Sequence, residues 1–294
     1  MESTAPFAKM NGIGNQILVA DMRAHGGRVA SHAAVALAAD AHTHFDQLMA
    51  VYDSPSQGQP LEMEIFNADG SRAGACGNGT RCVVDYLSRH GMEGTEIFRF
   101  SVEGKPLAAK RLEDGRIAVN MGLPRLEWDQ IPLSEEFADT RGIELEIGPA
   151  GAPLLHTPSV ANMGNPHVIF WAQDSVENYA LDKFGPMIEN HMLFPDRVNV
   201  TVAQVTGPES LTMRTWERGA GLTQACGSAA CAAVVSAARL GKTGRKVTAT
   251  LPGGQLEIEW RDDLCVIMTG GATHEFDGRF NPATGQWEKL GEPV

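Results

Sequence analysis

Short runs of mixed apolar and polar residues, separated by turn residues, recur along the chain and predict strands. Four clear runs are Gln16–Asp21, Leu48–Tyr52, Glu62–Asn67 and Val198–Val202, and they have the length and composition of strands. Asp114-Gly115 joins two such runs, and Arg261-Asp262-Asp263 joins two others. Turn residues between two strand-like runs indicate a hairpin, so the pattern predicts antiparallel pairing.

Two further segments carry apolar residues at helical spacing and end at a glycine. The first is Thr80–His90, followed by Gly91. The second is Ser228–Leu240, followed by Gly241, and it is so rich in alanine that we expect it to pack on all sides. Each half of the chain therefore reads as many short strands around one buried helix, which is an α+β fold and not a parallel βαβ array.

The chain repeats itself at an offset of 150 residues, as Gly14 against Gly164 illustrates. In the same register Met63 matches Met213, and Ala75-Cys76-Gly77 matches Ala225-Cys226-Gly227. Chance explains a few single matches, but not a shared tripeptide and a shared helix end in one register. We therefore predict two pseudo-symmetric copies of one fold, 1–125 and 126–274, with 275–294 as an extension.

Length and composition narrow the classes of protein that this chain can be. With 294 residues, 43% of them hydrophobic, the chain is long enough for two domains. Its formal net charge of −12 argues against a nucleic-acid or anionic-membrane partner. We find no apolar run of membrane-spanning length and no signal-peptide pattern after Met1, and the odd count of 5 cysteines argues against a secreted disulfide framework. We expect a cytoplasmic protein.

Cys76 and Cys226 each precede a glycine at the start of a predicted buried helix. The unpaired N–H groups and the positive dipole there favour an anion, lower the pKa of a thiol and can cradle a carboxylate. Two such thiols facing each other across a cleft between the halves suit inversion at a carbon α to a carboxylate. One thiolate would remove the α-proton from one face while the other thiol protonates the opposite face. No lysine has a recognisable pyridoxal-phosphate context, so we expect no cofactor.

The remaining cysteines and a histidine pair have more ordinary interpretations. We interpret Cys82, Cys231 and Cys265 as small buried apolar residues. The spacings Cys76–Cys82 and Cys226–Cys231 are wider than a zinc hook, so we expect no metal. His42 and His44 have metal-like spacing but lack further ligands, which favours a solvated helix end.

A series of ordered motifs covers nearly the whole chain. They are Lys9–Asn15 (KMNGIGN), Phe66–Ser71 (FNADGS), Cys76–Cys82 (CGNGTRC), Gly164–His167 (GNPH), Arg197–Val200 (RVNV), Trp216–Gly219 (WERG) and Ala225–Ser228 (ACGS). With these motifs the chain resembles the diaminopimelate epimerase family, cofactor-independent isomerases that convert LL-2,6-diaminopimelate to the meso isomer for lysine and peptidoglycan precursors. The resemblance implies two halves, each a mostly antiparallel barrel-like sheet around a central helix, with 275–294 returning to the first half. It also implies a homodimer acting on a small amino acid.

The resemblance further implies roles for individual residues. Cys76 would be the proton donor and Cys226 the proton acceptor, with roles that exchange with reaction direction. His167 and Glu217 would lie near the reacting ammonium and the thiols, and Arg218 would hold the distal carboxylate. The other implied substrate contacts are Asn15, Gln47, Asn67, Gly77, Asn78, Asn165, Asn199, Glu217, Gly227 and Ser228.

Each implied contact has a structural alternative. Asparagines beside glycine often serve turn geometry, Glu217-Arg218 could be an exposed ion pair, and His167 a hydrogen-bonded loop residue. The chain also departs from the family pattern: Asn11 and Gln16 stand where the family usually has His and Asp, and Gln224 lies in an altered second cysteine motif. These departures affect the packing around the second cysteine more than the reaction type.

Two alternative functions remain. A proline or hydroxyproline-type racemase on the same fold usually has His after Cys-Gly, whereas Asn78 follows Gly77 here. A thiol redox protein would carry closely spaced cysteines, which this chain lacks.

Overall fold

The computed structural model describes residues 4–149 and 151–291. This part of the chain divides into two compact units, one running up to Val119 and resuming at Gly270, the other spanning Asn120–Thr269. The boundaries predicted from the sequence, 125/126 and 274/275, lie a few residues later, and the second would cut strand β18 (Thr273–Phe280). Residues 1–3 and 292–294 of the predicted first half lie outside the described residues.

The first unit is one mixed sheet with two helices, α1 (Ser31–Ala39) and α2 (Gly77–Leu87). Strands β2 and β3 pair in parallel, as do β4 and β5, and the other neighbours are antiparallel. In the order in which they pair, the strands are β19 (Trp287–Lys289), β18, β1 (Ala5–Asn11), β2 (Gln16–Asp21), β3 (Gln47–Tyr52), β4 (Leu61–Asn67), β5 (Ile97–Val102), β6 (Lys105–Arg111) and β7 (Ile117–Asn120).

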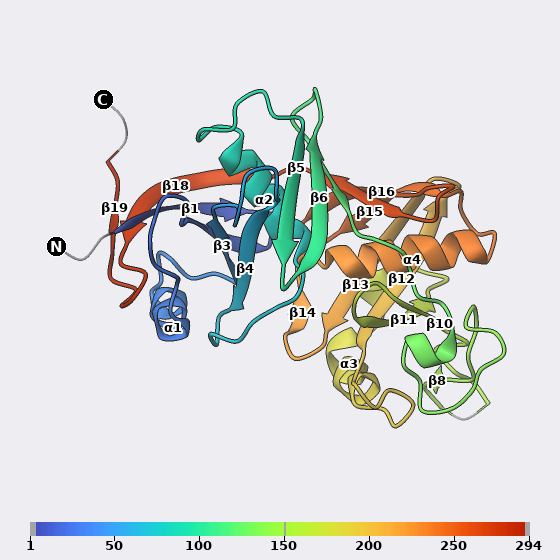
Figure 1. The fold of residues 1–294 in the computed structure, drawn as a ribbon. Coiled ribbons are helices and arrows are strands. Elements are labelled where there is room, and N and C mark those ends of the chain that lie inside the picture. The colour runs from blue at the N-terminus through green and yellow to red at the C-terminus, as the bar shows by residue number, and fades with distance from the viewer. Residues whose placement is uncertain (1–3, 150, 292–294) are drawn as a thin grey trace. The chain divides into compact units, whose positions relative to one another are not determined.

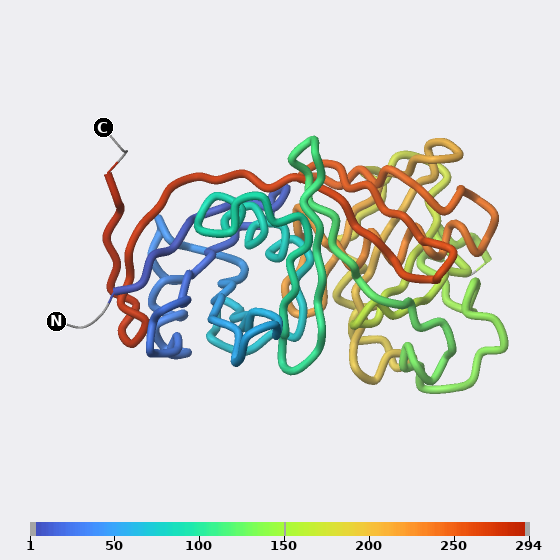
Figure 2. Tube along the Cα trace, turned by 45° about the horizontal axis from the view of Figure 1, so that its top comes forward, coloured from blue at the N-terminus to red at the C-terminus, as the bar shows by residue number. Residues whose placement is uncertain are grey.

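The C-terminal segment completes this first sheet. β18 lies antiparallel beside β1, with Ala5 opposite Phe280 and Asn11 opposite Thr273, and Figures 1 and 2 show the red strand alongside the blue one. Phe7 on β1 is buried, and its ring meets those of Phe276 and Phe280 edge-on, 6.1 Å between centroids in each case. Strands from the two ends of the chain therefore share one core.

The second unit has the same organisation without a C-terminal addition. Its helices are α3 (Leu181–Glu189) and α4 (Gly227–Arg239), with short 3-10 turns at Trp128–Gln130 and Val176–Asn178. The small strands β8 (Glu146–Ile147) and β9 (Leu155–His156) pair separately. Its sheet contains β10 (Ser159–Asn162), β11 (Pro166–Trp171), β12 (Asn199–Gly207), β13 (Ser210–Glu217), β14 (Gly221–Thr223), β15 (Lys246–Leu251), β16 (Gly254–Trp260) and β17 (Val266–Gly270).

The internal repeat is visible in the pairing pattern. From β1 to β7 successive pairs run antiparallel, parallel, antiparallel, parallel, antiparallel and antiparallel. From β10 to β17, with β14 as a side branch on β13, the order is the same. The predicted α+β fold of two pseudo-symmetric, mostly antiparallel halves is confirmed. Each half also contains a further helix that the sequence analysis did not predict, because α1 and α3 occupy equivalent crossovers.

The second helix of each unit is the central one. α2 contacts β1, β2, β3, β6 and β18, and α4 contacts β10, β11, β12, β15 and β16 (Figure 1). Most of α4 is buried, as its alanine content predicted, since small side chains let strands approach closely. α2 begins and ends three residues earlier than predicted. Across the described residues no helix is long and apolar enough to cross a membrane.

The cysteines assigned to the core have different environments. Cys82 and Cys231 are fully buried inside the central helices, as expected, and burial raises the pKa of Cys82 to about 12. Cys265 is only half-buried. It directly precedes β17, where the Asp263 carboxylate accepts its N–H at 3.1 Å, so its interpretation as a buried residue is wrong.

Candidate active site

Cys76 and Cys226 are the N-cap residues of the two central helices. Both have extended backbone, with φ of −151° and −122°, and Gly77 and Gly227 begin the helical turns. An N-cap residue stands beside backbone N–H groups that have no partner within the helix. Each unit therefore presents one thiol at a helix end suited to an anion.

In the first unit the thiol and the start of α2 are held by local hydrogen bonds. Cys76 Sγ accepts from the Gly79 N–H at 3.1 Å, and the Thr80 N–H donates to the Cys76 carbonyl at 2.9 Å. The Asn78 side chain, predicted near the substrate, is buried, and its Oδ1 accepts from Arg81 at 2.9 Å. Asn78 therefore anchors the helix start with its side chain.

The other predicted residues of the first unit gather at one end of β2, β3 and β4. Gln47 lies opposite Asn67 in the β3–β4 ladder. Asn15 Nδ2 donates to Asp46 Oδ2 at 2.7 Å, and the same oxygen accepts the Gln16 N–H at 2.7 Å. Asp46 orients Asn15, a role that the sequence analysis missed. A faint signal was that residue 46 and its repeat counterpart, residue 196, are both aspartate.

The departures from the family pattern have structural explanations. Asn11 Oδ1 accepts the Gly14 N–H at 2.6 Å and so closes the turn before Asn15. Gln16 contributes its backbone N–H to Asp46, and this contact does not depend on the side chain. Gln224 is exposed, and its carbonyl accepts from the Gly253 N–H at 2.8 Å.

In the second unit Cys226 is buried beside a carboxylate. It is 4% exposed, and its Sγ lies 3.6 Å from Ser228 Oγ. Burial raises the pKa of the Cys226 thiol well above its ordinary value, and the negative charge of Glu217 raises it further. The expectation of a lowered thiol pKa is therefore wrong for Cys226. Glu217 in turn accepts from Thr223 Oγ1 at 2.5 Å.

His167 is a fully buried neutral imidazole. Burial lowers its pKa to about 3, and the positive charge of Arg218 lowers it as well. Its Nε2 lies 2.9 Å from Asn165 Oδ1, an acceptor, so Nε2 carries the proton. Nδ1 is then an acceptor, and it has no hydrogen-bond partner among the described residues. His167 thus offers one buried lone pair.

Arg218 and Asn199 link further predicted site residues of the second unit through hydrogen bonds. The Arg218 N–H donates to Asn199 Oδ1 at 3.0 Å, and its guanidinium donates to the Asp196 carbonyl at 2.8 Å. Asn199 lies opposite His167 in the β11–β12 ladder, and its Nδ2 donates to the Pro166 carbonyl at 2.9 Å. The predicted residues of the second unit therefore form one connected group around Cys226.

The repeat places predicted site residues at equivalent positions, but their side chains differ in chemistry. Asn199 lies opposite His167 as Gln47 lies opposite Ile17. Glu217 ends β13 as Asn67 ends β4. The ionisable side chains at these strand positions, Glu217 and the imidazole, both belong to the second unit.

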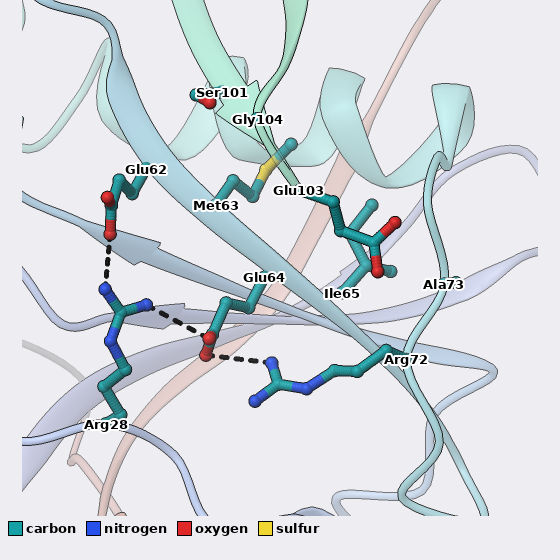
Figure 3. Close-up of a pocket in the computed structure, with 10 residues that line it drawn as sticks. All are labelled: Arg28, Glu62, Met63, Glu64, Ile65, Arg72, Ala73, Ser101, Glu103 and Gly104. Carbon is teal, nitrogen blue, oxygen red and sulfur yellow. Dashed lines mark hydrogen bonds and ion pairs between the residues drawn. The ribbon is translucent and has the colours of Figure 1, made fainter.

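A separate hollow of about 330 Å³ lies in the first unit, over β4 and the start of the β5–β6 turn. Figure 3 shows Glu64 between Arg28 and Arg72, with Arg28 also paired to Glu62. The Glu64 carboxylate lies 3.0 Å from Arg28 Nη1 and 2.9 Å from Arg72 Nη1. None of its lining residues was predicted to bind substrate.

Neither of the two histidines with metal-like spacing belongs to a metal site among the described residues. His42 and His44 are exposed beyond α1, and His44 Nδ1 lies 2.9 Å from the Ala38 carbonyl. Among the described residues, no group of three or more His, Cys, Asp or Glu side chains is arranged to hold a metal ion.

The two repeated α+β units define a fold class shared with solved proteins. A phenazine biosynthesis protein of the PhzF family from Bacillus anthracis aligns over 94% of this chain and 99% of its own, with a TM-score of 0.68 and 14% identity. A hydroxyproline epimerase from Agrobacterium vitis aligns over 94% and 92%, with a TM-score of 0.60 and 12% identity. At such identities the similarity concerns the fold alone.

Sequence comparison identifies the family within that class. The diaminopimelate epimerase family model matches residues 7–127 and 159–275. The diaminopimelate epimerase of Chelativorans sp. (strain BNC1) is 59% identical over 98% of both chains. The chain belongs to the diaminopimelate epimerase family.

Proposed function

We propose that this protein is a diaminopimelate epimerase, an isomerase that inverts one α-carbon of LL-2,6-diaminopimelate to give the meso isomer. The presence of one thiol at the N-cap of each repeated central helix is the observation that carries the proposal. Family membership over nearly the full length supports the same substrate. The reaction would supply precursors of lysine and peptidoglycan, without a cofactor.

The chemistry is a transfer of two protons at one carbon. Cys226, as thiolate, takes the α-proton, and the electrons of the C–H bond remain on carbon. Cys76, as thiol, then protonates the opposite face, so that the two sulfurs end with exchanged protonation states. N–H groups at Gly77-Asn78 and Gly227-Ser228 hold the carboxylate into which the carbanion charge spreads. In the reverse reaction the roles exchange.

The raised pKa of Cys226 adds a step to this scheme. A buried thiol beside Glu217 rests protonated, so it must lose its own proton before it can act as the acceptor. Glu217 is the adjacent carboxylate and the natural recipient, and Thr223 holds it in place. The bare Nδ1 of neutral His167 is a second acceptor in this group, suited to the ammonium of the substrate.

Arg218 favours diaminopimelate, which has an amino-acid group at each end, over a proline-like compound. Arg218 is suited to the distal carboxylate, because its guanidinium can donate two parallel hydrogen bonds. Asn15, Gln47, Asn67, Asn165 and Asn199 supply further contacts. A proline-type substrate has no second carboxylate to engage Arg218, and a thiol redox function is not favoured for a family of epimerases.

We also propose that the enzyme acts in the cytoplasm as a homodimer. The odd number of cysteines, which argues against a disulfide framework, supports the first statement, and the family resemblance supports the second. Light scattering of the purified protein at several concentrations checks the dimer: a mass that remains near 31.5 kDa contradicts it.

The decisive experiment follows hydrogen exchange and inversion together. Reduced, metal-chelated, pyridoxal-free protein is incubated with LL-diaminopimelate in D2O, and both α-deuterium and the meso isomer are measured. We expect both to appear with the wild-type protein, and we expect no meso isomer with Cys76→Ala or Cys226→Ala. Cys265→Ala, a change at a half-buried cysteine outside both helix starts, serves as the matched control and should retain turnover. Inversion by either alanine variant at the wild-type rate would remove that cysteine from the mechanism.

A further inference from the structure

Glu189, the last residue of α3, is a buried carboxylate that none of the sequence motifs contains. It is 5% exposed. A buried carboxylate is costly unless several donors compensate it, so its partners indicate why it is there.

Its partners belong to the two segments that carry predicted substrate residues. Oε2 accepts from Trp216 Nε1 at 2.7 Å. Oε1 accepts from the Gly219 N–H at 2.9 Å and from Arg197 Nη1 at 3.2 Å. Trp216 and Gly219 lie immediately on either side of Glu217 and Arg218. One carboxylate therefore fixes both ends of that dipeptide.

A backbone contact extends the same link to Asn199. The Val198 N–H donates to the Glu189 carbonyl at 3.2 Å, directly before Asn199 in the chain. Arg197, which binds the Glu189 side chain, has a φ of +59°, a conformation that side-chain-bearing residues rarely adopt. Glu189 thus stabilises the strained backbone at Arg197, just before β12, as well as the turn after β13.

Close packing makes α3 a rigid support for these contacts. A Cβ placed on Gly185 would lie 2.6 Å from Trp216 Cγ, so the indole lies directly against the helix backbone. The Trp216 side chain is therefore fixed by α3 at two points, the Gly185 backbone and the Glu189 carboxylate.

The repeat provides an independent observation. α1 and α3 correspond residue for residue at the offset of 150, so Ala39 of the first unit stands where Glu189 stands in the second. At the same offset Ala68 stands in place of Arg218. The buried carboxylate and the arginine therefore occur together in one copy of the fold and are both replaced by alanine in the other.

We propose that Glu189 is a positioning residue that orients Arg218 for the second carboxylate of the substrate. This inference rests on the proposed function, because it assumes that Arg218 binds that carboxylate. Glu189 acts through the backbone on either side of Arg218 and need not touch the substrate. It determines how well the enzyme recognises a substrate with a carboxylate at each end.

The test compares steady-state constants of variants that keep the size of the side chain. Glu189→Gln replaces one acceptor oxygen by an amide nitrogen that cannot accept from Trp216 or Gly219. We expect KM for diaminopimelate to rise about tenfold, with a smaller change in kcat, as for Arg218→Lys. Because both changes disturb the same contact, the double variant should be little worse than Arg218→Lys alone. Trp216→Phe, which removes one donor, should shift KM in the same direction by less.

Asp21→Asn is the matched control. Asp21 is also a buried carboxylate, 8% exposed, and it accepts from Arg23 and from the Tyr86 hydroxyl in the first unit. We expect this variant to lose stability without a change in KM.

The outcomes separate the inference from the proposal beneath it. An unchanged KM in Arg218→Lys means that the distal carboxylate is held elsewhere, and the proposed role of Arg218 fails. A raised KM in Arg218→Lys with an unchanged KM in both Glu189→Gln and Trp216→Phe overturns the inference alone. Fully additive effects in the double variant overturn it as well. If Glu189→Gln does not fold, the KM of Trp216→Phe decides.

Discussion

At the scale of single residues, the pKa of the Cys226 thiol depends on two opposing influences, the helix start that it caps and the groups that bury it. Its place at a helix start was readable from the glycine that follows it, and that position alone lowers the pKa of a thiol. Burial and the neighbouring Glu217 dominate instead and raise the pKa. Both depend on how β13 and α4 pack, so no local pattern in the sequence reveals them. The burial of His167 is hidden from the sequence in the same way.

The lowered pKa of His167 predicts acid sensitivity of the fold. Below about pH 6.5 the unfolded chain binds a proton at this residue, whereas the folded protein does not until about pH 3. The stabilisation is complete above pH 6.5 and is lost as the pH falls toward 3, by about 1.4 kcal/mol per unit at most. We expect the free energy of unfolding, measured in urea, to fall less between pH 7 and pH 5 in His167→Gln than in the wild type. His42→Gln, at an exposed histidine, should show the wild-type dependence of the free energy of unfolding on pH. The same pH dependence in all three proteins would contradict a buried neutral imidazole at His167.

At the scale of elements, the strands and the central helices followed from the sequence, whereas α1 and α3 did not. Runs of mixed apolar and polar residues bounded by turn residues located β2, β3, β4 and β12, although β2 and β3 are buried on both faces in the structure. α1 lacks a side-chain cap at its start, and α3 contains Gly185-Pro186, a dipeptide that normally argues against a helix. Tertiary packing decides both, so pattern analysis missed them and with them Glu189.

Close contact between α2 and β3 predicts a penalty for any side chain at Gly79. A Cβ there would overlap the buried Met49 side chain, so either that side chain or the first turn of the helix would have to shift. We expect Gly79→Ala to lower the free energy of unfolding by about 1–3 kcal/mol and to reduce kcat, because the same turn positions Cys76. Gly26→Ala, at a site where a Cβ meets nothing within 4 Å, is the control. Wild-type stability and turnover in Gly79→Ala would show that the turn tolerates displacement.

At the scale of the whole molecule, the internal repeat was the most informative feature of the sequence. The offset of 150 residues predicted two copies of one fold, and the pairing order of the strands repeats accordingly. The repeat could not show which copy would hold the ionisable group around Cys226. That depends on single substitutions at equivalent strand positions, such as Ile17 against His167.

The contribution of the C-terminal segment to the first unit predicts an effect on stability without one on catalysis. The Trp287 ring lies 6.0 Å from that of Phe7 and 6.2 Å from that of Phe276. We expect Trp287→Ala to lower the free energy of unfolding by about 1–3 kcal/mol. Because the predicted site residues of this unit lie on β2–β4 and at the start of α2, kcat and KM should remain unchanged. Leu290→Ala, at an exposed position nearby, controls for the segment itself, and a loss of activity matching the loss of stability would contradict this separation.

The pairing of β1 with β18 also sets an order of events during synthesis. The sheet that contains the beginning of the chain cannot close until Thr273–Phe280 has left the ribosome. At about 5–20 residues per second, translation of Asn120–Thr269 alone takes roughly 8–30 s. During that time β1 has an open edge, the kind of surface on which nascent chains pair with one another. The second unit is continuous in the chain, so it can finish folding first. A chain released before Thr273–Phe280 is made would have a folded second unit and a first unit whose open β1 edge can pair with other chains.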